Sequence, residues 1–87
     1  MLVWKQSFQA IQGSVTTRFP KGAVLISARE QGNLVAVWAL CDPANPVQES
    51  GIELVETGRE RLFKGDFVGT AIFDDGAYVL HVFSVDD

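Results

Sequence analysis

The segment Thr57–Gly65 concentrates positive charge in an acidic chain. It carries Arg59, Arg61 and Lys64 between two glycines, whereas the 87 residues together have a net charge of −4. Glycines allow backbone N–H groups to turn toward a ligand, and guanidinium groups bind phosphate or carboxylate through two parallel hydrogen bonds. The pattern therefore predicts a loop that binds an anion or a partner. The alternative is a solvated loop whose cations pair with neighbouring carboxylates.

Other residues could complete such a site. Lys21 would add a fourth cation if its turn lies at the same end of the fold. A nucleotide base could stack on an aromatic ring, because every base has a face that stacks. Trp4 is a candidate for this role and also for the core. The predicted ligand-binding residues are Lys21, Arg59, Arg61, Lys64, Trp4, Phe63, Tyr78 and His81.

Catalytic machinery is scarce in this sequence. His81 is the only histidine, and its position within Val79–Phe83 is typical of a strand histidine satisfied by a hydrogen bond. The alternatives for His81 are a ligand contact or a general base. No nucleophile motif surrounds Cys41 or any serine, and no histidine or cysteine spacing fits a metal site. We therefore predict that the protein is not an enzyme and has no catalytic residues, metal or cofactor.

Composition and length narrow the possibilities further. A chain of 87 residues predicts one domain, residues 1–87, and 47% hydrophobic residues are typical of a globular protein. The single cysteine cannot form an internal disulfide, and we expect it to be a small buried hydrophobic residue. Net negative charge argues against non-specific nucleic-acid binding. We also see no signal peptide and no apolar run near the ~18 residues of a membrane span.

The pattern of apolar residues predicts β-structure throughout. The predicted strands are Leu2–Phe8, Ser14–Phe19, Ala23–Glu30, Leu34–Cys41, Gly51–Gly58, Phe67–Phe73 and Ala77–Val85. Strict alternation along the third strand places Val24, Ile26 and Ala28 on one face. About seven short, mainly antiparallel strands predict an all-β fold, either a small sandwich or a partly open barrel. Because open sheets have exposed edges that can pair with another copy, we expect a homo-oligomer.

The run Leu34–Cys41 is apolar at every position. Such a strand is usually central and covered on both faces, so we expect Trp38 to lie in the core. The segment Asp42–Ser50 follows with two prolines, which cannot donate hydrogen bonds to a neighbouring strand. Strand pairing is therefore predicted to stop across this segment.

Several short motifs occur together in an order that resembles one family. The motifs are WK (Trp4–Lys5), PKGAVLI (Pro20–Ile26), VWALCDP (Val37–Pro43), ETGRE (Glu56–Glu60), FVGTAIFDDG (Phe67–Gly76) and VLHVF (Val79–Phe83). The set spans nearly the whole chain and resembles a family of short β-rich proteins of unknown function encoded by phages, prophages and bacteria. Arg59 stands where that family commonly has histidine, so a role for an imidazole there does not carry over. The resemblance implies a viral or mobile-element origin and no established activity.

These observations leave three binding functions. The first is a non-enzymatic oligomeric sponge that sequesters an anionic nucleotide-type ligand, such as a cyclic-nucleotide signal of host immunity. The second is an inhibitor that docks on a host protein or defence complex, for which edge strands are suited. The third is a small virion accessory protein. We expect a cytoplasmic location, in the host if the protein is phage-encoded, with no membrane partner.

Overall fold

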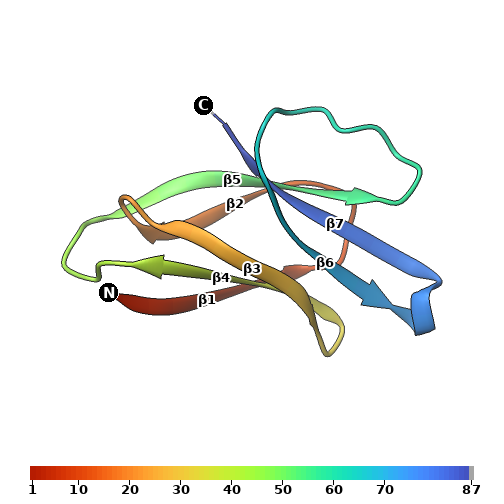
Figure 1. The fold of residues 1–87 in the computed structure, drawn as a ribbon, viewed down its shortest axis with the longest axis horizontal. Coiled ribbons are helices and arrows are strands. Elements are labelled where there is room, and N and C mark those ends of the chain that lie inside the picture. Colours follow the sequence, from red (N-terminus) through yellow and green to blue (C-terminus); the bar gives the residue numbers. More distant parts are fainter. Residues whose placement is uncertain (87) are drawn as a thin grey trace.

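The computed structural model describes residues 1–86 and confirms an all-β fold, with seven strands and one short 3₁₀ turn among these residues. The elements are β1 (Leu2–Gln9), β2 (Gly13–Pro20), β3 (Val24–Gln31), β4 (Leu34–Cys41), β5 (Val47–Glu56), β6 (Phe67–Phe73), the 3₁₀ turn Asp74–Gly76 and β7 (Tyr78–Val85). Figure 1 shows them along the longest dimension of the molecule.

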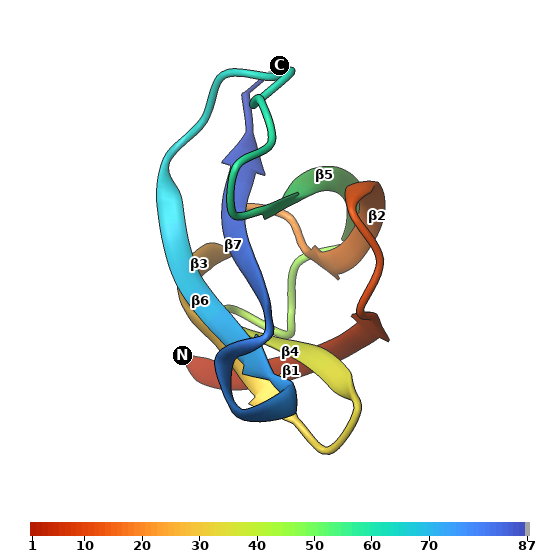
Figure 2. The ribbon, with the colours of Figure 1, turned by 90° about the vertical axis from the view of Figure 1, so that its right-hand side faces the viewer.

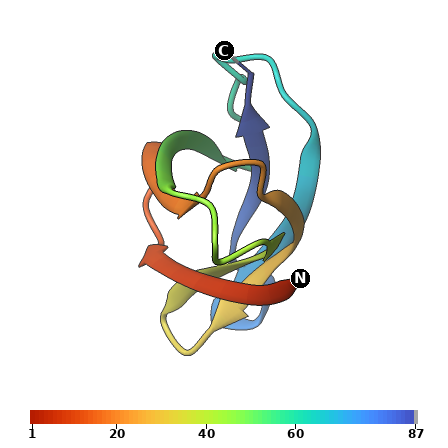
Figure 3. The ribbon, with the colours of Figure 1, turned by 90° about the vertical axis from the view of Figure 1, so that its left-hand side faces the viewer.

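The strands form two antiparallel sheets. One has the order β1-β4-β3, and the other has the order β2-β5-β7-β6. Seen along the long axis, the strands surround a common interior, with β1 below and β6 and β2 on opposite sides (Figure 2). The view from the other end shows the same arrangement (Figure 3). Because the two sheets do not join through strand pairing into one closed sheet, the fold is a partly open structure.

The core lies between the inward faces of the two sheets. Its buried residues are Ala28, Val35, Val37, Ile52, Leu54, Ala71, Leu80 and Val82. Alternation along β5 directs Ile52 and Leu54 inward, into this core. Cys41 at the end of β4 is also fully buried, and its Sγ lies 3.7 Å from the carbonyl oxygen of Leu2. The expectation that this cysteine is a buried hydrophobic residue is confirmed.

The start of β5 differs from the prediction. We expected no strand before Gly51, but β5 begins at Val47. Its first residues pair with β2, where Val47 lies opposite Pro20 and Ser50 lies opposite Thr17. Three of them, Gln48, Glu49 and Ser50, are polar and exposed and gave no local strand signal, and the partner strand is about thirty residues away in the chain. A long-range pairing therefore overrides the local pattern.

The outer face of β4 is not covered by another layer, so the prediction of coverage on both faces is wrong. β4 is the central strand of its sheet, as expected. However, Trp38 is only half-buried and lies outside the core cluster. The register places Val3 and Val24 on either side of Leu40, and these two valines are 55% and 56% exposed. On this outer face, the side chains of β4 are therefore covered only by side chains of the neighbouring strands β1 and β3.

A β-bulge in β3 corrects the predicted grouping of Ile26 with Ala28. The pairing of β3 with β4 shifts register between Leu25 and Ser27. A bulge inserts one extra residue, so the alternation of faces changes phase at that point. Ala28 is consequently in the core, whereas Ile26 is 49% exposed.

The two sheets meet where β3 passes β6. A Cβ atom on Gly69 would lie 2.2 Å from the carbonyl oxygen of Ala28, so only glycine fits there. Two residues further along β3, the Oε1 atom of Glu30 accepts a hydrogen bond of 2.9 Å from the N–H of Ile72. These contacts fasten one edge of each sheet to the other without strand pairing.

The close approach at Gly69 leads to a stability prediction. We expect Gly69→Ala to lower the free energy of unfolding by about 2–4 kcal/mol, because the added methyl group forces two backbones apart. Gly51→Ala is the matched control, since a Cβ atom there would meet only the side chain of Val85, at 3.3 Å. The free energy of unfolding of Gly51→Ala should fall by less than about 1.5 kcal/mol. Urea unfolding measures both values, and equal losses would contradict the proposed constraint.

Glu30 should make stability depend on pH. Hydrogen bonds from the N–H of Ile72 and from Arg29 lower the pKa of the Glu30 carboxyl below its ordinary value. A carboxyl group with a lowered pKa in the folded state adds stability above its unfolded pKa and loses it as pH falls through the folded pKa. We expect the stability difference between wild type and Glu30→Gln to shrink over that acid range. Unfolding curves at a series of pH values test this, and a constant difference would refute it.

Candidate functional site

The basic segment forms the loop between β5 and β6, as the sequence predicts. This β5–β6 loop, residues 57–66, is the long excursion beside the C-terminal end of β7 in Figure 1. Glu53 lies on the outward face of β5 beneath it and is only 2% exposed. Its carboxylate accepts hydrogen bonds from the backbone N–H groups of Leu62, at 2.7 Å, and Phe63, at 3.4 Å. Since a buried carboxylate is costly without such partners, Glu53 holds the loop against the sheet.

Arg61 provides a second anchor for the β5–β6 loop. Its guanidinium carbon lies 3.9 Å from the centre of the Phe83 ring, and its Nη2 donates a hydrogen bond of 2.8 Å to the carbonyl oxygen of Gly65. Phe67 packs edge-on against the same ring, with 5.7 Å between the ring centres. A cation over an aromatic face gains electrostatic energy. Arg61 is therefore engaged in holding the loop.

The end of the loop runs beside the end of β7. The N–H of Ser84 donates to the carbonyl oxygen of Asp66 at 2.8 Å, and the N–H of Asp86 donates to that of Lys64 at 2.7 Å. A Cβ atom on Gly65 would lie only 1.6 Å from the carbonyl oxygen of Ser84. The backbones can approach this closely only because residue 65 is glycine.

The anchored loop presents an apolar tip between cations. Leu62 is 75% exposed and Phe63 is 44% exposed. Arg59 and Lys64 are also exposed. Within residues 1–86, the ion pairs lie elsewhere, between β2 and β5 and within β3. Among the residues that the structure describes, Arg59 and Lys64 therefore have no carboxylate within ion-pair distance.

The structure separates Lys21 from Arg59. Lys21 lies in the turn after β2, where its N–H donates to the carbonyl oxygen of Pro46, just before β5 begins. Arg59 follows the opposite end of β5. At the rise of a β-strand, the ten residues of β5 separate the two places by roughly 30 Å. Figure 1 shows the turn and the loop toward opposite ends of the long axis.

The predicted aromatic residues do not gather at the loop either. Phe63 belongs to its tip, but Trp4 is half-buried in β1, on the other sheet. Tyr78 packs against the core, and its hydroxyl donates a hydrogen bond of 3.1 Å to the carbonyl oxygen of Ala10. Trp4 and Tyr78 therefore form no stacking surface with Phe63.

His81 is held between two threonines. Its Nε2 lies 2.9 Å from the hydroxyl oxygen of Thr57, and its Nδ1 lies 3.4 Å from that of Thr70. This is the hydrogen-bonded strand histidine that the sequence favours. Thr57 opens the β5–β6 loop, so the contact also fastens the beginning of the loop to β7.

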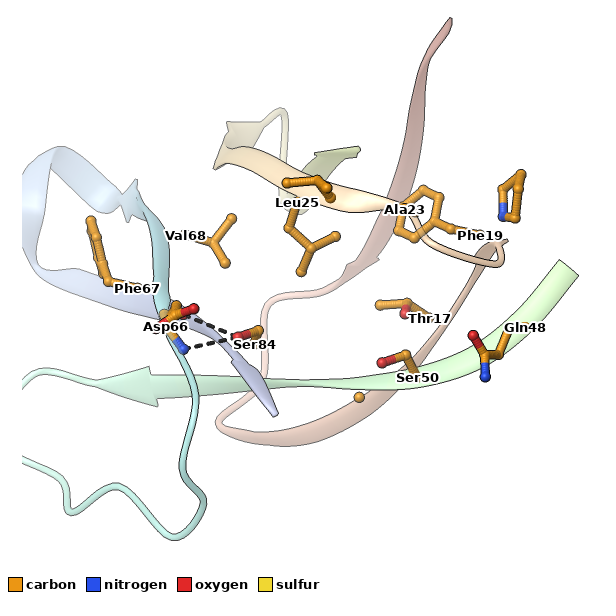
Figure 4. A pocket seen from close by; sticks show the side chains of 13 residues that line it. Thr17, Phe19, Ala23, Leu25, Gln48, Ser50, Asp66, Phe67, Val68 and Ser84 are labelled. Atoms are coloured by element: carbon orange, nitrogen blue, oxygen red, sulfur yellow. Dashed lines mark hydrogen bonds between the residues drawn. The ribbon is translucent and has the colours of Figure 1, made fainter. Parts of the chain in front are cut away.

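A cavity of about 330 Å³ opens between the two sheets, and sequence reasoning missed it. We call it the seam cavity. Thr17, Ser50 and Gln48 of β2 and β5 line one wall, and Leu25 and Val68 of β3 and β6 line the other (Figure 4). None of the predicted binding residues lines it. Its wall comes from strands that meet only in the folded chain, so no local pattern could have indicated it.

Comparison with known proteins gives one match. A family model described as a domain of unknown function (DUF7352) matches residues 1–87. The chain belongs to this family. Its membership in a family without a known function agrees with the resemblance seen in the sequence. The comparisons with curated proteins and with solved structures find no match. Across residues 1–86, no helix has the length and apolar character needed to cross a bilayer.

The anchoring role of Glu53 can be tested by Glu53→Gln. The amide keeps one acceptor oxygen but replaces the other with a donor, so one loop N–H loses its partner. We expect a loss of about 1–3 kcal/mol in stability. Amide hydrogen exchange should accelerate at Leu62 and Phe63 while the strands stay protected. The exposed residue Glu49, changed to Gln, is the control. Unaltered exchange at both loop amides would rule out the anchor.

Proposed function

We propose that the protein is a non-enzymatic binding protein that docks on an acidic surface of another protein through the β5–β6 loop. The observation that carries this proposal is the exposed pair Leu62 and Phe63, whose own backbone N–H groups are held by the buried carboxylate of Glu53. The backbone of the tip is fixed while its side chains face solvent.

A fixed, exposed apolar tip supports binding for an energetic reason. Ordering a flexible loop on association costs free energy, and a loop that is already ordered avoids most of this cost. Binding energy in protein interfaces concentrates in a few apolar or aromatic anchors surrounded by polar groups. Phe63 and Leu62 fit the role of anchors, and Arg59 and Lys64 fit the role of the polar rim.

The charge of the loop supports an acidic partner. Arg59 and Lys64 are exposed and have no ion pair among residues 1–86. Cations at the rim of an interface attract an acidic surface and suppress association with basic ones. Because the rest of the chain is acidic, these cations also orient the molecule so that the loop approaches first.

The shape of the loop favours a protein over a nucleotide. Capture of a small anion requires a concave site where several donors converge. The residues that line the seam cavity include no lysine or arginine, and the cations lie on an exposed loop outside it. Docking on a host protein or defence complex is therefore the better supported of the functions that the sequence leaves open. The resemblance to phage-encoded proteins points to a bacterial host as the source of that partner.

The proposal is tested by affinity capture from a bacterial lysate with four proteins. Wild type and the control Lys21→Ser should retain the same partner in a stoichiometric complex. The double variants Leu62→Ser/Phe63→Ser and Arg59→Ser/Lys64→Ser should each bind it at least about tenfold more weakly. These changes leave the backbone bonds to Glu53 in place.

Two results would overturn the docking function. One is a partner that binds all four proteins equally, because the loop would then play no part. The other is a nucleotide released from the purified protein on denaturation and absent from the Arg59→Ser/Lys64→Ser variant, which would favour sequestration of a small anion instead.

A further inference from the structure

The seam cavity is a product of the way the two sheets join. β3 and β6 touch at Ala28 and Gly69. Immediately before this contact in each strand the register shifts, between Leu25 and Ser27 in β3 and between Phe67 and Gly69 in β6. Bulges bend the strands that contain them, and bulged strands often lie beside binding sites. Leu25 and Phe67 both line the cavity, which therefore occupies the space where the two bulged strands separate.

One wall of the cavity carries hydrogen-bonding groups. Thr17 lies opposite Ser50 in the pairing of β2 with β5, and Gln48 lies two residues before Ser50 on the same face. All three line the cavity (Figure 4). Hydroxyl and amide groups can both donate and accept hydrogen bonds, so this wall suits a polar ligand of either kind.

The cavity carries a single charge, and it is negative. Asp66 is the one ionisable residue in its lining. Hydrogen bonds with Ser84 hold both sides of its backbone: the N–H of Asp66 donates to Oγ at 2.9 Å, and its carbonyl oxygen accepts from the Ser84 N–H at 2.8 Å. Within residues 1–86, its carboxylate makes no ion pair. In a chain with net charge −4, this end of the cavity attracts a cation.

Apolar and aromatic side chains form the remaining wall. Phe19 and Phe67 line the cavity together with Leu25 and Val68. Aromatic faces attract ammonium groups as well as flat apolar bodies. The volume of about 330 Å³ is at the small end of the range of pockets that bind small organic molecules.

From this arrangement we infer that the seam cavity binds a small organic cation, with its ammonium group at Asp66 and a flat apolar body against Leu25 and Val68. The cavity uses only the last residue of the β5–β6 loop, Asp66, whereas the proposed docking surface uses the tip of the loop with Arg59 and Lys64. The two sites take opposite charges, since the cations are exposed at the surface and the carboxylate of Asp66 belongs to the cavity lining. The cavity site needs no chemical step, only binding.

Three probes of matched shape test the inference: 2-phenylethylamine, which is cationic at neutral pH, 2-phenylethanol, which is neutral, and phenylacetate, which is anionic. Each is titrated into the isotopically labelled protein and followed by amide chemical shifts. The amine should shift the amides of Thr17, Ser50 and Ser84, with a Kd on the order of 1 mM for so small a molecule. The alcohol should bind roughly fivefold more weakly or worse, and the acid should produce no shifts.

Two variants test separately the contribution of the Asp66 carboxylate and that of the open volume of the cavity. Asp66→Asn should reduce the affinity for the amine to that for the alcohol, whereas the control Asp75→Asn, in the turn between β6 and β7, should leave it unchanged. Ser50→Leu should abolish binding of both by filling the cavity. The same spectra show whether each variant is folded. The inference fails if the probes bind equally, if no shifts occur at the cavity, or if Asp66→Asn retains the preference for the amine.

Discussion

The contact between Gly69 and Ala28 is the constraint on which the rest of the structure depends. A side chain at residue 69 would collide with the backbone of β3, so the missing Cβ atom allows the two sheets to approach. That approach closes the core on one side, where Glu30 adds a hydrogen bond to Ile72. On the other side the bulged strands separate and leave the seam cavity. The same crossing therefore produces both the stability and the candidate pocket.

Glu53 plays a comparable role on the outside of the four-stranded sheet. Its buried carboxylate is satisfied by two backbone N–H groups of the β5–β6 loop instead of a cation. The guanidinium group of Arg61 in turn lies over the ring of Phe83 and donates a hydrogen bond to the carbonyl oxygen of Gly65. Arg59 and Lys64 thus remain exposed at the surface. The loop is ordered by groups that face inward, and the groups proposed to bind a partner face outward, which links its packing to the proposed docking.

The sequence predicts strands well where the residues of the strand are themselves apolar and β-branched or aromatic, and it fails where a distant partner strand decides the pairing. β4 and β6 begin and end where the pattern places them. Val47–Ser50 carries no apolar alternation and becomes a strand only because β2 supplies its pairing partners. Ile26 leaves its predicted face because the pairing with β4 forces a bulge. Trp38 follows the pattern of a core residue, yet no second layer lies over its side of the sheet.

By itself, the sequence determined the all-β class and the position of the basic loop, because strands have a side-chain period of two residues and a short charged segment between two glycines breaks that pattern. Only the tertiary structure decided which strands are neighbours. That choice put Lys21 and Arg59 at opposite ends of β5, placed Glu53 under the loop and opened the seam cavity beside Asp66. Each of these depends on contacts between segments far apart in the chain, and alternation along one strand carries no information about the identity of its partner.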